Sequence, residues 1–361
     1  MRSWLTDHRR IADQRLRHQL ITRPGSRRVD WVVAWLGAVQ AQEYGPAKWG
    51  LALRSSPGTR DSDVERAVAQ GRILRTHVLR PTWHFVARDD LRWMLELTAP
   101  AVHRRIATYH QHLGLHAPVV TRAIGVIERV LGDGGCLTRA ELGINLARAG
   151  LPAGRMELAQ IMMYAELEGV ICSGPRRGKQ FTYSLLAHRA PPGRSFQRDE
   201  ALAELSRRYF RSHGPATVRD FVWWSGLRTS DAVRGLEMIR ARSREVDGLR
   251  YWSVGRSAPA GPAKKAAVHL LPIYDEYLVA YRDRRAVPRP AYDRGGLQHA
   301  LVIAGRVVGT WRVIPGATSV AIELAAQRRL TAGEQRGLAQ VTARYGRFLG
   351  VPARLHRSAR I

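Results

Sequence analysis

Two glutamines separated by one residue, Gln40 and Gln42, have the spacing in this sequence that is most suggestive of chemistry. A carboxamide carries no charge and offers both hydrogen-bond donors and an acceptor. Two such groups, held rigidly, can orient a water molecule and turn their carbonyl oxygens toward a developing positive charge. Glutamine is rarely catalytic, however, and the same side chains can simply satisfy backbone groups at a helix end. The residues alone leave both interpretations open.

The element expected to position these amides is a helix from Val29 to about Gln42. Four apolar residues recur on it at the spacing of one helical face and predict a buried stripe: Val32, Trp35, Leu36 and Val39. At about 100° per residue, Gln40 and Gln42 lie on opposite edges of that stripe, close to the helix end near Gly45. Both amides are therefore expected at the rim of a buried face.

One order of elements, three helices followed by a two-stranded hairpin, occurs three times along the chain. This order is typical of a winged helix-turn-helix. The middle copy is the clearest, because Thr138 and Glu141 form a capping box at one helix start and the hairpin loop 173–180 is basic and polar. In the last part of the chain, 268–279 is expected to be a strand and 331–349 a closing helix.

The predicted fold is therefore α+β and mainly helical, with three tandem winged-helix modules and a small β-rich C-terminal unit. The modules are expected at 1–115, 116–195 and 196–260, and the C-terminal unit at 261–361. Such a module is not exclusive to DNA binding, because the same helices and hairpin also build protein-interaction domains.

The charge balance indicates a polyanionic partner. Among 361 residues, 58 are Lys or Arg and 30 are Asp or Glu, which gives a net charge of +28. A GC-rich genome explains why nearly all the basic residues are arginine, but not why basic residues outnumber acidic ones. Since 45% of the residues are hydrophobic, the chain can also build real cores. Nucleic acid is thus the expected partner, because Lys and Arg gain affinity by releasing counterions from phosphates.

Two groups of basic residues are the candidates for DNA contacts. The first lies on the hairpin loop of the middle module, and the second follows Tyr281: Arg176, Arg177 and Lys179, and Arg282, Arg284 and Arg285. Solvated surface charge is the alternative interpretation for each of them.

Other classes of protein are excluded or disfavoured by composition. Two cysteines, Cys136 and Cys172, exclude a disulfide framework and a four-cysteine zinc ribbon, and no other cluster has metal-ligand spacing. No apolar run approaches the roughly 20 residues of a membrane span, and the chain start lacks the apolar stretch of a signal peptide. We therefore expect a soluble cytoplasmic protein without a metal or cofactor. The absence of a heptad run favours a monomer.

Seven stretches of the chain, in this order, resemble the winged-helix DNA glycosylase superfamily and, more narrowly, its AlkZ-like branch of azinomycin-resistance glycosylases: 35–44, 47–54, 80–86, 89–93, 271–278, 281–284 and 305–312. The Gln-x-Gln of Gln40 and Gln42 is the specific part of this resemblance, because a sister branch carries Gln-x-Asp at that place.

The resemblance implies a C-shaped array of three winged helices around duplex DNA and the excision of bulky N7-alkylated purines, including interstrand crosslinks. It assigns catalysis to Gln40 and Gln42. An N7-alkylated purine is cationic and already a good leaving group, so two neutral amides that place a water at C1′ can suffice for its hydrolysis. The expected reaction is monofunctional hydrolysis without strand cleavage, since nothing indicates that Lys48 is desolvated to act as a nucleophile.

Two further residues are possible parts of the site lining, His84 and Asp275. His84 is alternatively a core histidine, and Asp275 alternatively orients a nearby arginine in a salt bridge, as does its neighbour Glu276. For the whole chain, the alternatives to a glycosylase are a non-catalytic winged-helix DNA-binding protein or transcription regulator, and an interaction scaffold without salt-dependent DNA affinity.

Overall fold

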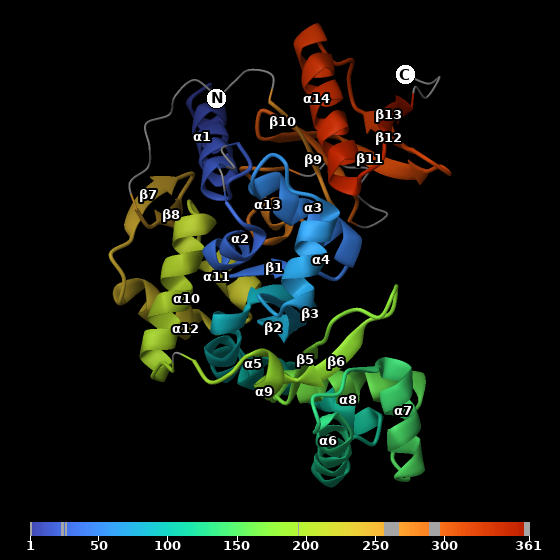
Figure 1. The fold of residues 1–361 in the computed structure, drawn as a ribbon. Coiled ribbons are helices and arrows are strands. Elements are labelled where there is room, and N and C mark those ends of the chain that lie inside the picture. Colours follow the sequence, from blue (N-terminus) through green and yellow to red (C-terminus); the bar gives the residue numbers. More distant parts are fainter. Residues whose placement is uncertain are drawn as a thin grey trace.

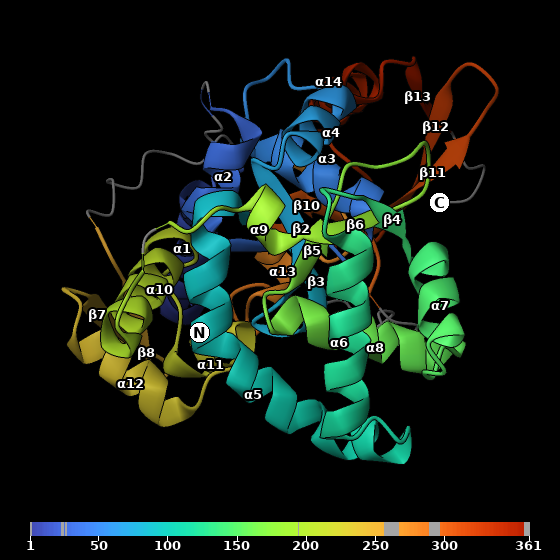
Figure 2. The same ribbon diagram turned by 60° about the horizontal axis from the view of Figure 1, so that its bottom comes forward.

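The computed structural model describes residues 2–22, 25, 27–193, 195–255, 267–288 and 297–356. It is an α+β fold in which helices and four small sheets alternate along the chain (Figure 1). Helices α6 (Ala117–Leu131), α7 (Arg139–Arg148) and α8 (Arg155–Leu167) lie at the opposite end of the molecule from α14 (Ala332–Leu349) in the view of Figure 1, and α6 and α8 also lie far from α14 in Figure 2. None of the described helices combines the length and the apolar character that a membrane crossing requires.

The N-terminal part contains four helices and a three-stranded antiparallel sheet in the order β1-β3-β2. Its elements are α1 (Arg2–His18), α2 (Val29–Leu36), β1 (Ala38–Gln40), α3 (Tyr44–Arg54), α4 (Asp61–Ala69), β2 (Ile73–Val78) and β3 (Arg80–Ala87). The helix predicted from Val29 to Gln42 is therefore wrong beyond Leu36. Gly37 has φ 84° and ends α2, because this left-handed backbone cannot continue a right-handed helix. Gln40 instead lies on a strand.

The middle part begins with the short η1 (Arg88–Asp90) and the long α5 (Leu91–His112). A second three-stranded sheet, in the order β4-β6-β5, follows with three helices. These elements are α6 (Ala117–Leu131), β4 (Leu137–Thr138), α7 (Arg139–Arg148), α8 (Arg155–Leu167), β5 (Ile171–Ser173) and β6 (Thr182–Leu185). The predicted capping box is confirmed, because Thr138 accepts from the backbone N–H of Glu141 and Glu141 accepts from that of Thr138.

The next part has four helices and one hairpin. They are α9 (Leu186–Arg189), α10 (Arg198–Ser212), α11 (Val218–Ser225), α12 (Thr229–Glu237), β7 (Arg242–Val246) and β8 (Leu249–Ser253). The turn predicted at Asp247 and Gly248 joins β7 to β8, with φ 50° and φ 68° at these two residues. Positive φ at both central positions matches the twist of a two-residue hairpin.

The C-terminal part is a five-stranded sheet in the order β13-β12-β11-β10-β9, covered by the predicted closing helix. Its elements are β9 (Val268–Leu271), α13 (Glu276–Val279), β10 (Ala300–Ile303), β11 (Arg306–Pro315), β12 (Val320–Ala326), α14 (Ala332–Leu349) and β13 (Ala353–His356). The strand predicted over 268–279 is too long. Asp275 accepts a hydrogen bond from the Tyr277 N–H and caps a helical turn, so the chain leaves the sheet after Leu271.

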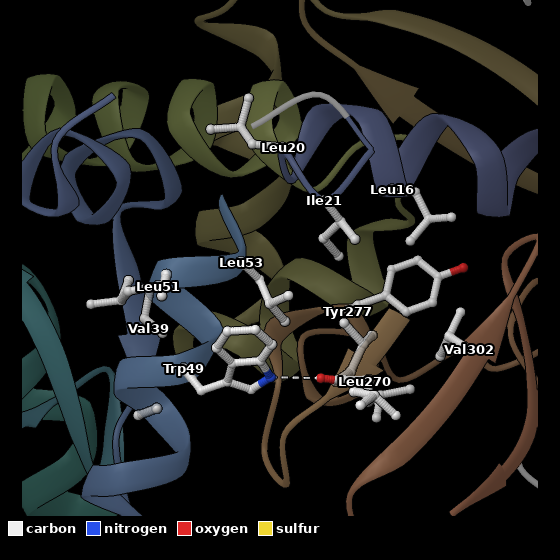
Figure 3. Packing of buried hydrophobic residues seen from close by; sticks show 14 of the residues in the cluster. Leu16, Leu20, Ile21, Val39, Trp49, Leu51, Leu53, Leu270, Tyr277 and Val302 are labelled. Carbon is white, nitrogen blue, oxygen red and sulfur yellow. Dashed lines mark hydrogen bonds between the residues drawn. The ribbon is translucent and has the colours of Figure 1, made fainter. Parts of the chain in front are cut away.

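The N-terminal and C-terminal parts share one buried core. Trp49 of α3 is 1% exposed and donates its Nε1–H to the Leu270 carbonyl of β9, at 2.8 Å (Figure 3). Tyr277 and Val302 belong to the same cluster. The helices α6, α7 and α8 enclose a separate cluster. The strand that carries Gln40 is therefore supported from the C-terminal side of the chain.

Candidate active site

The two glutamines lie at the end of an edge strand. Gln40 is paired with His84 across the β1–β3 ladder, and the Ala41 N–H continues the ladder to the Trp83 carbonyl at 2.7 Å. Gln42 follows at a bend beyond the end of β1, so neither the helix expected from the sequence nor the alternation of a strand sets the direction of its amide. Gln40 is 8% exposed, and Gln42 is half-buried.

Gln40 is fixed by a cation on its side chain and an anion on its backbone. The Arg80 guanidinium donates through Nη2 to Gln40 Oε1 at 3.1 Å, and the Gln40 N–H donates to Glu276 Oε1 at 2.7 Å. Glu276 is 1% exposed and also accepts from Trp224 Nε1 at 3.0 Å. Burial raises the pKa of Glu276, but the nearby His213 and the Gln40 N–H outweigh it, so the pKa lies below its usual range. A charged carboxylate therefore closes the free edge of β1.

Gln42 is fixed mainly through its backbone. Arg75 donates through Nε to the Ala41 carbonyl at 3.0 Å and through Nη2 to the Gln42 carbonyl at 3.4 Å. Its guanidinium carbon lies 4.3 Å from the centre of the Trp83 ring and 4.7 Å from that of Phe181. The Gln42 side chain accepts from the Trp83 N–H at 3.4 Å through Oε1. A sandwiched arginine thus holds the bend that follows β1.

His84 is a core histidine. It has no exposed surface, and its Nδ1 lies 2.8 Å from the Thr82 carbonyl. Burial lowers the pKa of His84 to about 3, so the ring is neutral near pH 7. The cross-strand register places it opposite Gln40.

Asp275 orients an arginine, as the alternative interpretation held. It is 4% exposed and forms two hydrogen bonds with Arg54, at 2.8 and 2.7 Å. Its neighbour Glu276, rather than Asp275 itself, contacts the glutamine pair.

The basic residues of the middle hairpin loop are partly engaged within the protein. Arg176 donates to Glu65 at 2.9 Å, and Arg177 donates to Glu141 at 2.7 Å, whereas Lys179 is exposed. The loop lies against the N-terminal part, because Phe181 packs edge-on against Tyr44 at a centroid distance of 5.0 Å.

The second basic group lies on the other flank. Arg282 is exposed, with its guanidinium 5.5 Å from the Trp223 ring, and Arg285 pairs with Asp283 at 3.1 Å. Arg284 donates to the Leu278 carbonyl at 3.2 Å. The Trp223 ring also lies 5.9 Å from the guanidinium of Arg80, the residue that donates to Gln40. Arg282 and Arg80 therefore lie beside the same ring.

A cavity of about 200 Å³ borders the β2–β3 hairpin at Pro81 and Trp83. Tyr109 of α5 and Met163 of α8 form further walls, and Arg139 of α7 and Tyr183 of β6 complete the lining. Aromatic and thioether groups suit a planar apolar substituent.

Two other kinds of chemistry find little support. Lys48 is 5% exposed and donates to Asp61 at 2.8 Å and to Glu65 at 2.6 Å, so its ammonium is held by two carboxylates. Within the described ranges, no three His, Cys, Asp or Glu side chains gather as metal ligands would.

The sequence reasoning missed Arg75 and Arg80 and gave Glu276 only a general role. Arg80 and Trp83 fall in the stretch 80–86 that carries the resemblance, which was the one available signal. No pattern within β2 distinguishes Arg75 from a surface arginine, because its partners belong to other elements.

Comparisons with known proteins identify the family of the chain. The family model for DNA glycosylase AlkZ-like proteins matches residues 33–348. The chain is 27% identical over 310 residues to an interstrand DNA cross-link repair glycosylase of Streptomyces sahachiroi, covering 78% of this chain and 81% of that protein. The solved structure of Streptomyces sahachiroi DNA glycosylase AlkZ superposes with a TM-score of 0.78 at 24% identity, over 96% of this chain and 99% of that one. The chain therefore belongs to the AlkZ-like family of DNA glycosylases.

Proposed function

We propose that this protein hydrolyses the N-glycosidic bond of bulky, cationic N7-alkylpurines in duplex DNA, including purines joined in interstrand crosslinks. The observation that carries the proposal is that the amides of Gln40 and Gln42, two residues apart, are both anchored on β3, the first by Arg80 and the second by the Trp83 N–H. A carbonyl oxygen has two lone pairs, so each amide can still accept from a water. The cross-link repair named for the S. sahachiroi relative agrees with this substrate class.

In the proposed reaction, the amide oxygens of Gln40 and Gln42 hold a water beside C1′ and face the oxocarbenium ion. The bond from C1′ to N9 breaks, and its electron pair neutralises the cationic purine, which leaves. The water oxygen bonds to C1′, and its extra proton passes to solvent. Because neutral amides stabilise the cation less than a carboxylate does, uracil and other neutral lesions are not expected as substrates.

We also propose that the three helix-and-hairpin parts act as winged-helix modules that surround the duplex in a C shape, and that the protein works as a monomer. In the two basic groups, Lys179 and Arg282 are exposed and would contact phosphates first, while the residues now paired with carboxylates would have to exchange partners. The cavity beside Pro81 and Trp83 offers space for part of a bulky adduct.

A duplex oligonucleotide with one N7-alkylguanine tests the function. Wild-type protein is expected to release the free modified base and leave an alkali-labile abasic site. Gln40→Ala and Gln42→Ala should lose excision while DNA affinity stays within about threefold, since they touch the reacting centre rather than phosphates. Gln340→Ala, an exposed glutamine on α14, is the matched control and should excise normally. Binding without base release would support the non-catalytic DNA-binding alternative.

A further inference from the structure

Arg80 has hydrogen-bonding capacity that the protein itself does not use. In contrast to the buried Arg54, which pairs with Asp275, Arg80 forms no ion pair with any described carboxylate. Nη2 donates to Gln40, and Nε is enclosed without a partner. Nη1 donates to no described residue and, unlike Nε, is not fully enclosed. Burial lowers the pKa of the Arg80 guanidinium. The nearby Glu276 carboxylate offsets this cost of burial only in part, and an anion at Nη1 would offset more of it.

The backbone at Arg80 is held in a conformation that the chain would not adopt freely. The preceding Leu79 is fully buried at φ 64°, a left-handed conformation that is uncommon for leucine. Its N–H donates to Thr98 Oγ1 at 3.3 Å, and a Cβ added to Gly226 would lie 2.3 Å from its carbonyl oxygen. Strain of this kind persists where the surroundings impose it, often at functional sites.

The surroundings of Arg80 suit an anion that approaches from solvent. Trp223 is 40% exposed and is anchored by its Nε1–H on the Val279 carbonyl at 2.9 Å. Arg80 lies 5.9 Å from this ring and the exposed Arg282 lies 5.5 Å from it. Two guanidinium groups therefore share one surface aromatic ring beside a catalytic amide. A guanidinium binds a phosphodiester through its planar fork of N–H groups.

We propose that Arg80 is a positioning residue that binds a DNA phosphodiester at the lesion through Nη1 while Nη2 continues to hold Gln40 Oε1. The ligand is one backbone phosphate of the duplex, and the inference rests on the proposed glycosylase function. In the free protein the guanidinium holds the amide with a single hydrogen bond. When the phosphate binds, the guanidinium is held from both sides, so docking of the backbone also fixes the amide oxygen relative to C1′.

This arrangement separates Arg80 from an ordinary phosphate contact. Loss of an ordinary contact weakens binding and leaves the rate at saturating enzyme unchanged, whereas loss of the link to Gln40 lowers that rate. Arg282 provides the matched control, because it shares the Trp223 ring but is not bonded to Gln40 through its side chain.

The experiment measures single-turnover excision and DNA affinity for wild type, Arg80→Gln, Arg80→Lys and Arg282→Gln. Substrates carry an N7-alkylguanine and a single uncharged methylphosphonate at each nearby position in turn. Arg80→Gln and Arg80→Lys are expected to lower the rate at saturating enzyme by about thirtyfold. Neither a carboxamide nor a single ammonium can bridge phosphate and amide as the planar guanidinium does. Arg282→Gln is expected to weaken binding only. One methylphosphonate position should slow wild type by about tenfold and leave Arg80→Gln unaffected, as in a double-mutant cycle.

Three results would overturn the inference. In the first, Arg80→Gln excises at the wild-type rate at saturating enzyme. In the second, a methylphosphonate slows excision equally in wild type and Arg80→Gln. In the third, Arg80→Lys excises at the wild-type rate. Thermal unfolding of each variant separates these outcomes from loss of fold. If wild type releases no base from the all-phosphate duplex, the proposed function fails. The affinity measurements still test the phosphate contact. One methylphosphonate position must then weaken DNA binding by wild type and have no effect on binding by Arg80→Gln.

Discussion

Replacement of Glu276 by glutamine removes charge at the point where three parts of the chain meet. The carboxylate accepts from the Gln40 N–H at 2.7 Å and from Trp224 Nε1 at 3.0 Å, and it lies 3.4 Å from His213 Nε2. A glutamine at this position keeps one oxygen acceptor, so its NH₂ group must face one of these N–H donors.

The expected cost follows from these contacts. One charge-assisted hydrogen bond is lost and another becomes neutral, which together should lower the free energy of unfolding by about 3 kcal/mol. Because the Gln40 N–H lies on the free edge of β1, loss of its hydrogen bond should also loosen the Gln40 amide. Under the proposed function, excision should then slow by at least about tenfold, or about 1.4 kcal/mol.

Urea unfolding and single-turnover excision of Glu276→Gln measure the two effects. Glu237→Gln, an exposed residue at the end of α12, serves as the control and should match wild type in both assays. A Glu276→Gln protein that unfolds at the wild-type urea midpoint and excises at the wild-type rate would refute the reasoning.

Three further predictions follow from the structure. Gly226→Ala should destabilise the protein more than Gly350→Ala does. Both glycines have φ near 75°, but only at Gly226 would a Cβ lie 2.3 Å from the Leu79 carbonyl oxygen. Equal urea midpoints for the two variants would contradict this steric argument. Burial lowers the pKa of His84 to about 3 and of His269 to about 4, so below about pH 6.5 these rings take up protons in the unfolded chain but not in the folded one. The free energy of unfolding should therefore be lower at pH 5 than at pH 8 by about 4 kcal/mol for the two, and a flat urea-measured profile would count against it. DNA affinity should fall linearly on a logarithmic plot against salt concentration, as the net charge of +28 implies, and a salt-independent dissociation constant would favour the scaffold alternative.

Local features of the sequence were sufficient for several elements. The capping box at Thr138 and Glu141 and the turn at Asp247 and Gly248 were predicted and are confirmed, because each depends on residues within a few positions of one another. The closing helix, predicted over 331–349, is confirmed as Ala332–Leu349 for the same reason. The family resemblance likewise lay in short runs of residues and is confirmed by the family match over 33–348.

The helix predicted through Gln42 shows where local reasoning ended. The apolar spacing from Val32 to Val39 fits a helix, but Gly37 turns the chain, and the following residues pair with β3 instead. The spacing of apolar residues cannot distinguish a helix from a strand here, because β1 is stabilised by pairing with β3, which begins 40 positions after Gln40, at Arg80.

The sequence by itself therefore determined the charge, the local caps and turns and the family, and it singled out the two amides as candidates. The tertiary structure decided what holds those amides in place: Arg75, Arg80 and Glu276. The Glu276 carboxylate and the Gln40 N–H are 236 positions apart in the chain and 2.7 Å apart in space. Such contacts arise from the packing of whole parts around a shared core, and no propensity confined to a short window can specify them.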